Sequence, residues 1–189
     1  FRFPLEYGGQ RTPTAQWTAT ASGSAIVGMG GNGVHIEAVC IGKVNDLGVT
    51  DANNMGAAMA PAAADTIYNF LTDTATAPDD YDMIVTGDLS AVGTELLRDL
   101  LERKGIKLGD KHADCGLMIY DREKQDVHAG GSGCGCSASV LCSYLLGKLE
   151  RRELHNLLFV ATGALMSPTS SQQGESIPGI AHLIHLTAQ

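Results

Sequence analysis

The chain has 189 residues, of which 44% are hydrophobic and 18% are charged, a length that supports one compact core and is short for two independent domains. Its formal net charge of −8 argues against a protein that binds nucleic acid through the phosphates. No run approaches the ~18 apolar residues of a membrane-spanning helix, so we expect no transmembrane segment.

The beginning of the chain has little regular structure. It opens on Phe1 and reads like the interior of a larger protein, so we expect it to be a piece of one. Residues 1–14 carry several Pro and Gly residues and no hydrophobic period, which predicts an extended loop. Two β-prone runs follow, Ser24–Met29 and Val34–Val44, on either side of a glycine-rich turn. This pattern predicts a β-hairpin.

Strands and helices then alternate. Apolar residues on one face predict a helix over Pro61–Thr72, with its proline in the first turn. The short apolar run Met83–Thr86 predicts a buried strand. A second amphipathic helix is predicted over Glu95–Lys104, and Gly105 is placed to end it.

The second half of the chain repeats this alternation. We predict a strand over Gly116–Tyr120, a glycine-rich loop over Gly130–Gly135 and a helix over Ser137–Lys148. The last strands are predicted over Leu157–Ala161 and Ile180–Leu186. The order ββαβαβαββ predicts an α/β fold whose mixed sheet is covered on both faces.

The glycine-rich loop is the most informative motif. Closely spaced glycines let backbone N–H groups converge, and the start of the following helix adds partial positive charge, so the loop is suited to hold a carboxylate. A tight strand-to-helix turn needed only for packing explains the pattern equally well. No Gly-Lys-Ser/Thr follows, so the loop is not a Walker motif.

The cysteines favour free thiols. Cys134 and Cys136 are the closest pair, but no second pair stands at ligand spacing and no Cys-x-x-Cys occurs. We therefore predict no metal site and no cofactor. His128 precedes the loop and is more consistent with a hydrogen-bonded or solvated side chain than with a ligand contact. The polar loop from Met166 to Glu175 is either a pocket wall, a partner surface or a simple crossover.

Several blocks of sequence carry a family resemblance. They are Tyr7-Gly8-Gly9-Gln10, residues 13–18, residues 55–68, Val85-Thr86-Gly87-Asp88-Leu89, residues 120–127 and Ala161-Thr162-Gly163-Ala164-Leu165. The chain resembles the stage V sporulation protein AD family over essentially its whole length. This resemblance implies a thiolase-like fold, dipicolinic acid binding and membership of the channel assembly that moves dipicolinate into the developing spore and out during germination.

The resemblance also implies a division of the chain. Residues 1–22 are the linking loop from an N-terminal half that is missing here, and residues 23–189 are the C-terminal thiolase-like domain, one half of an αβαβα layered architecture. The nucleophilic cysteine of an active thiolase belongs to the other half. The expected partners are that half or a second copy of the chain, together with other proteins of the channel assembly.

Three catalytic elements of thiolases have counterparts that lack the chemical group. Ser132 stands where the histidine of Gly-His-Pro-x-Gly is expected, and a hydroxyl is too weak a base to replace an imidazole near neutral pH. Asp88 lies in a segment that matches Asn-Glu-Ala-Phe only loosely, and Thr162 stands in place of the second cysteine. We therefore predict a noncatalytic protein.

The resulting prediction is a pocket for dipicolinate, taken alone or as its calcium chelate, in a protein of the forespore or spore interior that is peripheral to the inner membrane. The predicted ligand-binding residues are Asp88, Gly131, Ser132, Gly133, Cys134, Gly135, Cys136, Ser137 and Met166. Two alternatives remain. One is an acyl-thioester enzyme that uses Cys134 or Cys136 as nucleophile. The other is an assembly module without a working pocket.

Overall fold

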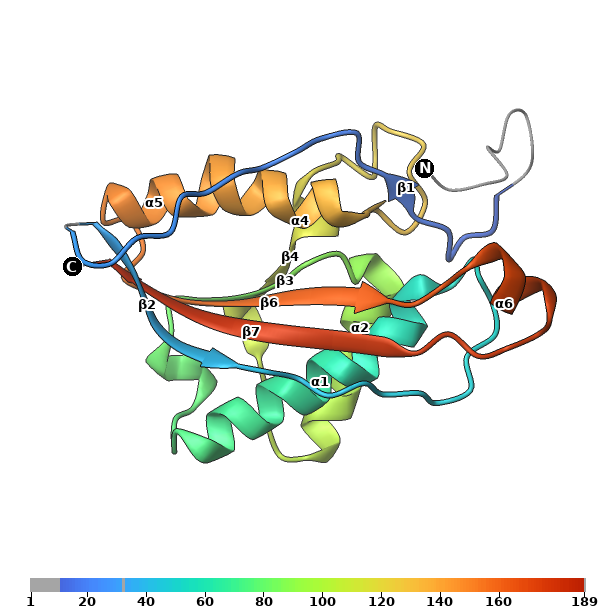
Figure 1. Ribbon diagram of the computed structural model, residues 1–189, viewed down its shortest axis with the longest axis horizontal. Helices are drawn as coiled ribbons and strands as arrows, with labels where there is room; N and C mark the ends of the chain where they lie inside the picture. The colour runs from blue at the N-terminus through green and yellow to red at the C-terminus, as the bar shows by residue number, and fades with distance from the viewer. Residues whose placement is uncertain (1–10, 32, 189) are drawn as a thin grey trace.

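The computed structural model describes residues 11–31 and 33–188 of the chain. A central sheet lies between two helical layers (Figure 1). Helices α1 (Met55–Asp73) and α2 (Ser90–Arg103) lie below the sheet in this view, and α4 (Cys134–Val140) and α5 (Leu146–Glu150) lie above it. The predicted α/β architecture with a sheet covered on both faces is confirmed.

The sheet has five strands, in the order β2-β7-β6-β3-β4. Their bounds are Val34–Cys40 for β2, Met83–Thr86 for β3, His112–Asp114 for β4, Asn156–Ala164 for β6 and Gly179–Ala188 for β7. Strand β3 is parallel to β4 and β6, whereas β7 is antiparallel to β6 and β2. The sheet is therefore mixed, as predicted, and the carboxyl ends of β3, β4 and β6 meet at one edge.

Each face of the sheet has its own apolar core. Below it, Ile67 of α1 and Leu97 and Leu101 of α2 are fully buried in one cluster with residues of β3, β6 and β7. Above it, Leu145 and Leu149 belong to a second cluster. The upper helix is continuous, because α4 passes through the π-helical turn Leu141–Leu145 into α5. This run contains the predicted helix Ser137–Lys148.

The predicted hairpin is wrong. The run Ser24–Met29 is not a strand, and β2 pairs instead with β7, the last strand of the chain. Residues leading into this run pack on α4, where a Cβ added to Gly23 would lie 2.1 Å from the carbonyl oxygen of Ala138. From this contact the chain runs along the upper helices (Figure 1). Strand β2 therefore pairs with a strand distant in the sequence, and no hairpin forms with Ser24–Met29.

The strand predicted over Gly116–Tyr120 is also wrong. The strand lies just before it, as β4, and Cys115–Met118 forms the short helix α3. The side chain of Asp114 accepts a hydrogen bond from the backbone N–H of Gly116, which is the N-cap interaction that starts a helix. An apolar run alone does not reveal such a cap.

Helix boundaries differ from the predictions at their starts. Asn54 caps α1 through the N–H of Ala57, so Pro61 lies inside the helix and not in its first turn. Helix α2 starts at Ser90, before the predicted Glu95. Its end agrees with the prediction, since Gly105 has a φ of 81° and donates to the carbonyl of Glu102 in a left-handed helix termination.

The remaining elements are short. Strand β1 (Trp17–Thr18) pairs in parallel with β5 (Gly131–Ser132), so the predicted linking loop reaches the glycine-rich loop. The polar loop after β6 contains helix α6 (Pro168–Gln172), and single helical turns occupy Pro78–Asp80 (η1) and Gly109–Lys111 (η2). The predicted loop of residues 1–14 falls mostly outside the described residues. Among the described helices, none is both long and apolar enough to cross a membrane.

Candidate functional site

The carboxylate of Asp88 joins three segments of the chain. It follows β3 and is only 6% exposed. Its Oδ2 accepts hydrogen bonds from Ser132 Oγ at 3.0 Å and from the N–H of Gly133 at 2.7 Å. Its Oδ1 accepts from Thr162 Oγ1 at 2.8 Å. The turn after β3, the glycine-rich loop and β6 therefore meet at one side chain.

This contact changes the interpretation of the glycine-rich loop. The N–H of Gly133, predicted to hold a ligand carboxylate, already donates to the protein's own carboxylate. Gly133 has a φ of 101°, in the left-handed region that favours glycine. A Cβ on Gly135 would lie 2.2 Å from the carbonyl oxygen of Ala21, so packing also requires a glycine there. The structure thus supports the packing interpretation for these two positions.

A second buried carboxylate, Asp114, lies on the other side of the same turn. It is 1% exposed. Its Oδ1 accepts from the N–H groups of Ser90 at 2.8 Å and Gly116 at 2.9 Å, and its Oδ2 accepts from the N–H of Leu89 at 2.9 Å and from Thr86 Oγ1 at 2.5 Å. Asp114 therefore fixes the start of α2 and of α3 together.

Ser90 connects Asp114 to the glycine-rich loop. Its φ is 55°, which is strained for a residue with a side chain, and its hydroxyl donates to the carbonyl of Gly131 at 2.6 Å. The N–H bond to Asp114 and the hydroxyl bond to Gly131 hold it in this conformation. The two carboxylates thus position the loop from both sides.

A cavity of about 290 Å³ opens beside Asp88. It is lined by Met55, Met59, Asp88, Ser132, Gly133, Cys134, Thr162, Gly163, Ala164 and Met166. Five of the predicted ligand-binding residues are therefore brought together: Asp88, Ser132, Gly133, Cys134 and Met166. The other four, Gly131, Gly135, Cys136 and Ser137, do not line it. Gly131, Gly135 and Cys136 are buried and Ser137 is half-buried.

The cysteines near the cavity differ in reactivity. Burial, together with the nearby charges of Asp88 and Asp114, raises the pKa of Cys136 to about 12. Burial also raises the pKa of Cys115, strongly. Neither thiol ionises near neutral pH, and only a thiolate is an effective nucleophile. Cys134 is exposed at the cavity edge. In the described part of the chain, no histidine, lysine or arginine lines this cavity.

We expect a neutral alkylating reagent such as iodoacetamide to modify Cys134 in the folded chain at pH 7.5 and to leave Cys115 and Cys136 unmodified. The reason is that Cys134 is exposed, whereas the other two thiols are buried and protonated. Mass spectrometry of peptides after timed alkylation measures this, and a denatured sample is the control in which all three react. Modification of Cys136 as fast as Cys134 would contradict it.

The comparisons with known proteins identify the family. The family described as "Stage V sporulation protein AD (SpoVAD)" matches residues 1–187. The chain belongs to the SpoVAD family. It is 50% identical over 182 residues to "Stage V sporulation protein AD" of Bacillus subtilis (strain 168), an alignment that covers 96% of this chain and 54% of that protein. The chain therefore spans about half the length of the curated relative.

Solved structures give weaker similarities to this SpoVAD family member. The acetyl-CoA acetyltransferase of Bacillus anthracis is 18% identical, with a TM-score of 0.42 over 83% of this chain and 31% of that one. A 3-oxoacyl-(acyl-carrier-protein) synthase III is 13% identical, with a TM-score of 0.44 over 83% of this chain and 50% of that one. With TM-scores below 0.5, neither match supports a statement about chemistry.

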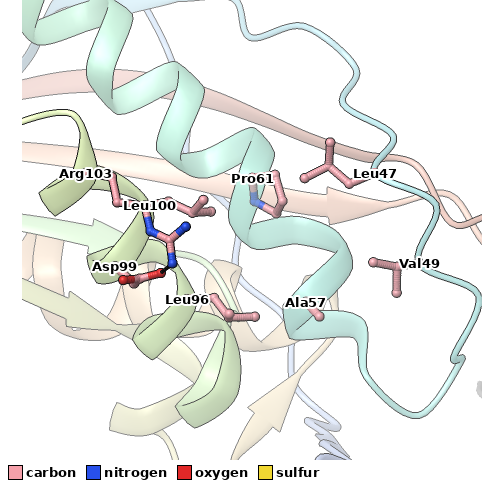
Figure 2. Close-up of a pocket in the computed structure, with 8 residues that line it drawn as sticks. All are labelled: Leu47, Val49, Ala57, Pro61, Leu96, Asp99, Leu100 and Arg103. Atoms are coloured by element: carbon pink, nitrogen blue, oxygen red, sulfur yellow. Dashed lines mark ion pairs between the residues drawn. The ribbon is translucent and has the colours of Figure 1, made fainter.

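A second cavity of the SpoVAD-family chain, of about 250 Å³, lies between α1, α2 and the loop after β2 (Figure 2). Its wall is mostly aliphatic, and an ion pair between Arg103 and Asp99, 2.7 Å apart, lies at one end. None of the predicted ligand-binding residues contributes to it. The cavity beside Asp88 therefore remains the candidate site.

Other predicted candidates lie away from this site. The ring of His128 makes contacts at 2.8 Å to the carbonyl of Thr12 and at 3.0 Å to Asp126, which agrees with a hydrogen-bonded role. Within the described residues, no group of three or more His, Cys, Asp and Glu side chains is placed to bind a metal ion.

Sequence reasoning missed part of the site. Met55 and Met59 line the cavity from the first turns of α1, and their spacing of four residues would have placed them on one helix face. His112 contacts Thr86 and through it reaches Asp114. No sequence signal marks this contact, because it joins two neighbouring strands.

Proposed function

We propose that this chain is a noncatalytic, dipicolinate-binding part of a SpoVAD protein that acts in spore dipicolinate uptake and release. The observation that carries the proposal is family membership, with 50% identity over 96% of the chain to a sporulation protein. The resemblance implies dipicolinate as the ligand, and the cavity beside Asp88 is the site in this chain that suits a small molecule. The proposal includes a location in the spore, at the inner membrane, among other proteins of the channel assembly.

The size and lining of the cavity support a ligand with one aromatic ring. Small-molecule sites commonly measure about 300 to 1,000 Å³, and this cavity of about 290 Å³ lies at the lower end. Met55, Met59 and Met166 offer apolar, polarisable side chains against which a pyridine ring can pack. A flat, single-ring acid fits this space better than an acyl chain bound to a large cofactor.

The charge of the site bears on the form of the ligand. Asp88 borders the cavity, and none of the described residues that line it is cationic. A dipicolinate dianion would be repelled by this carboxylate, because like charges a few ångströms apart interact strongly in a partly buried site. The 1:1 calcium chelate of dipicolinate is neutral and avoids this repulsion. We therefore favour the chelate as the bound form.

The chemistry available in the cavity supports binding without turnover. Ser132 and Thr162 donate their hydroxyl hydrogens to Asp88, and no histidine lines the cavity to act as a base. Cys136 is buried and protonated, and Cys134 has no base among the lining residues. The geometry thus gives no support to the alternative of an acyl-thioester enzyme.

Calorimetric titration tests the proposal. We expect dipicolinate with equimolar calcium to bind this chain, or the full-length relative from Bacillus subtilis, at least roughly tenfold more tightly than dipicolinate in a chelator. Replacing Met166 by Asp removes an apolar side chain against which the pyridine ring packs, so binding of the chelate should weaken by a similar factor. The matched control is Leu165→Asp, because Leu165 is 74% exposed and does not line the cavity.

The outcomes separate the alternatives. Equal loss of binding in both variants would show that the ligand lies elsewhere. Absence of binding to this chain and to the full-length relative would refute the proposal and favour an assembly module. Turnover of an acyl thioester, abolished by Cys134→Ala, would establish the enzyme alternative.

A further inference from the structure

Two buried carboxylates flank the turn between β3 and α2. Asp88 lies at its start, on the cavity side, and Asp114 binds the N–H groups of Leu89 and Ser90 behind it. Within the described part of the chain, neither carboxylate forms an ion pair with a lysine or an arginine. Ionising both therefore buries two like charges that no cation compensates, and a proton on one of them relieves this cost.

Asp114 belongs to a chain of hydrogen bonds, through Thr86 to His112, that can accommodate such a proton. Thr86 Oγ1 lies 2.5 Å from Asp114 Oδ2 and 3.1 Å from His112 Nε2, and all three side chains are buried. With Asp114 ionised, His112 Nε2–H donates to Thr86 and Thr86 donates to Asp114. With Asp114 protonated, its O–H donates to Thr86, and Thr86 donates to an unprotonated Nε2. In both directions Thr86 has one donor and one acceptor partner, while His112 Nδ1 is buried without a hydrogen-bond partner among the described residues.

The titratable groups around Asp114 indicate which side chain takes up the proton. Burial lowers the pKa of His112 to about 4, with a smaller contribution from Arg98, so this ring stays neutral between pH 5 and 7. Cys115 and Cys136 stay protonated, because burial raises the pKa of both thiols. The nearby Asp88 carboxylate contributes to the raised pKa of Asp114. Proton exchange within the hydrogen-bonded chain is therefore assigned to Asp114.

We propose that Asp114, Thr86 and His112 form a proton switch, in which proton uptake by Asp114 reverses the hydrogen bonds, converts His112 from the Nε2–H to the Nδ1–H tautomer and tightens the turn that carries Asp88. The switch acts on the wall of the cavity and does not depend on which ligand the cavity takes.

The direction of the pH effect follows from linkage. Burial raises the pKa of Asp114 from its usual 3.8 to about 6, although hydrogen bonds from Thr86, Ser90 and Leu89 oppose the shift. A raised pKa means that the closed turn binds the proton more readily than an open, solvated turn does. The stabilisation is therefore fully present below pH 3.8 and is lost as the pH rises through about 6.

Nuclear magnetic resonance of the ¹⁵N-labelled chain tests the switch. The ring nitrogens of His112 should change from the Nδ1–H pattern to the Nε2–H pattern as the pH rises, with a midpoint near 6. Amide exchange at Leu89 and Ser90, corrected for its intrinsic pH dependence, should show roughly tenfold greater protection at pH 5 than at pH 7.5. A single tautomer throughout, or protection that does not change, would overturn the proposal.

Three variants complete the test, the last of them as a control. Asp114→Asn, a neutral side chain, should keep His112 in the Nδ1–H form at all pH values. Thr86→Val removes the link, so the tautomer should no longer follow the pH. Asp110→Asn changes an exposed carboxylate nearby and should leave the parent profile intact. If Asp114→Asn does not fold, the parent profile and Thr86→Val still decide, because a tautomer change that persists without Thr86 contradicts the switch.

Discussion

Replacing Asp114 by Ala is expected to lower the free energy of unfolding by about 3 to 5 kcal/mol, a large part of the stability of a domain of this size. The carboxylate accepts from three backbone N–H groups and one hydroxyl at a site that is 1% exposed. Alanine leaves these donors without an acceptor, and the small space it creates does not admit solvent freely. Urea unfolding followed by circular dichroism measures the change.

The loss should reflect the buried hydrogen bonds and not the charge alone. Asp110→Ala removes an exposed carboxylate a few residues away and should change the free energy by no more than about 0.5 kcal/mol. Asp114→Asn retains one acceptor oxygen and should fall between the two. A loss below about 1 kcal/mol for Asp114→Ala would mean that the turn finds other partners, and it would also weaken the role given to this residue in the switch.

The apolar pattern of the sequence was sufficient to predict most of the buried strands of the fold. Strand Met83–Thr86 lies where predicted, because a short apolar run between polar segments has few alternatives to a covered strand. The end of α2 was predictable from Gly105, whose conformation suits helix termination. The starts of α1 and α2 were not, because the alanine-rich and small residues before Pro61 and Glu95 give no clear period.

Pairings between distant residues account for the other errors. The sequence around Ser24–Met29 allows a hairpin, but only the folded sheet shows that β2 gains a long antiparallel partner in β7. Asp88, which lines the cavity, was named as a ligand-binding residue only through the family resemblance. Asp114 and His112 were missed, since their contacts with Thr86 arise from the parallel pairing of β3 with β4. Local periodicity carries no information on such contacts.

An apolar surface on the upper layer has no cover in the described chain. Ile26 and Met29 are fully exposed, Val27 is 76% exposed, and Tyr144 on the neighbouring helical layer is 45% exposed. The segment that contains Ile26, Val27 and Met29 lies along α4 and α5 (Figure 1). Helix α5 and the turn before it bury Leu145 and Leu149 against the sheet, while Leu141 and Leu146 remain half-buried. Large apolar side chains exposed close together on a soluble protein commonly mark a contact surface.

We expect the isolated chain to associate with itself and to bind an apolar dye. Covering each large apolar side chain is worth roughly 1.5 to 3 kcal/mol, so three or four of them favour association at micromolar concentration. We expect the cover to be either a second copy or the part of the curated relative that lies outside the alignment, since the chain spans only 54% of that protein. Light scattering should give a mass that rises above 19.8 kDa with concentration.

The variant Ile26→Ser/Val27→Ser/Met29→Ser should lower both the mass and the dye signal. The control Ile41→Ser, which changes an exposed apolar residue next to β2, should lower them less. A mass that stays at the monomer value over a hundredfold range of concentration, without dye binding, would show that this surface needs no partner.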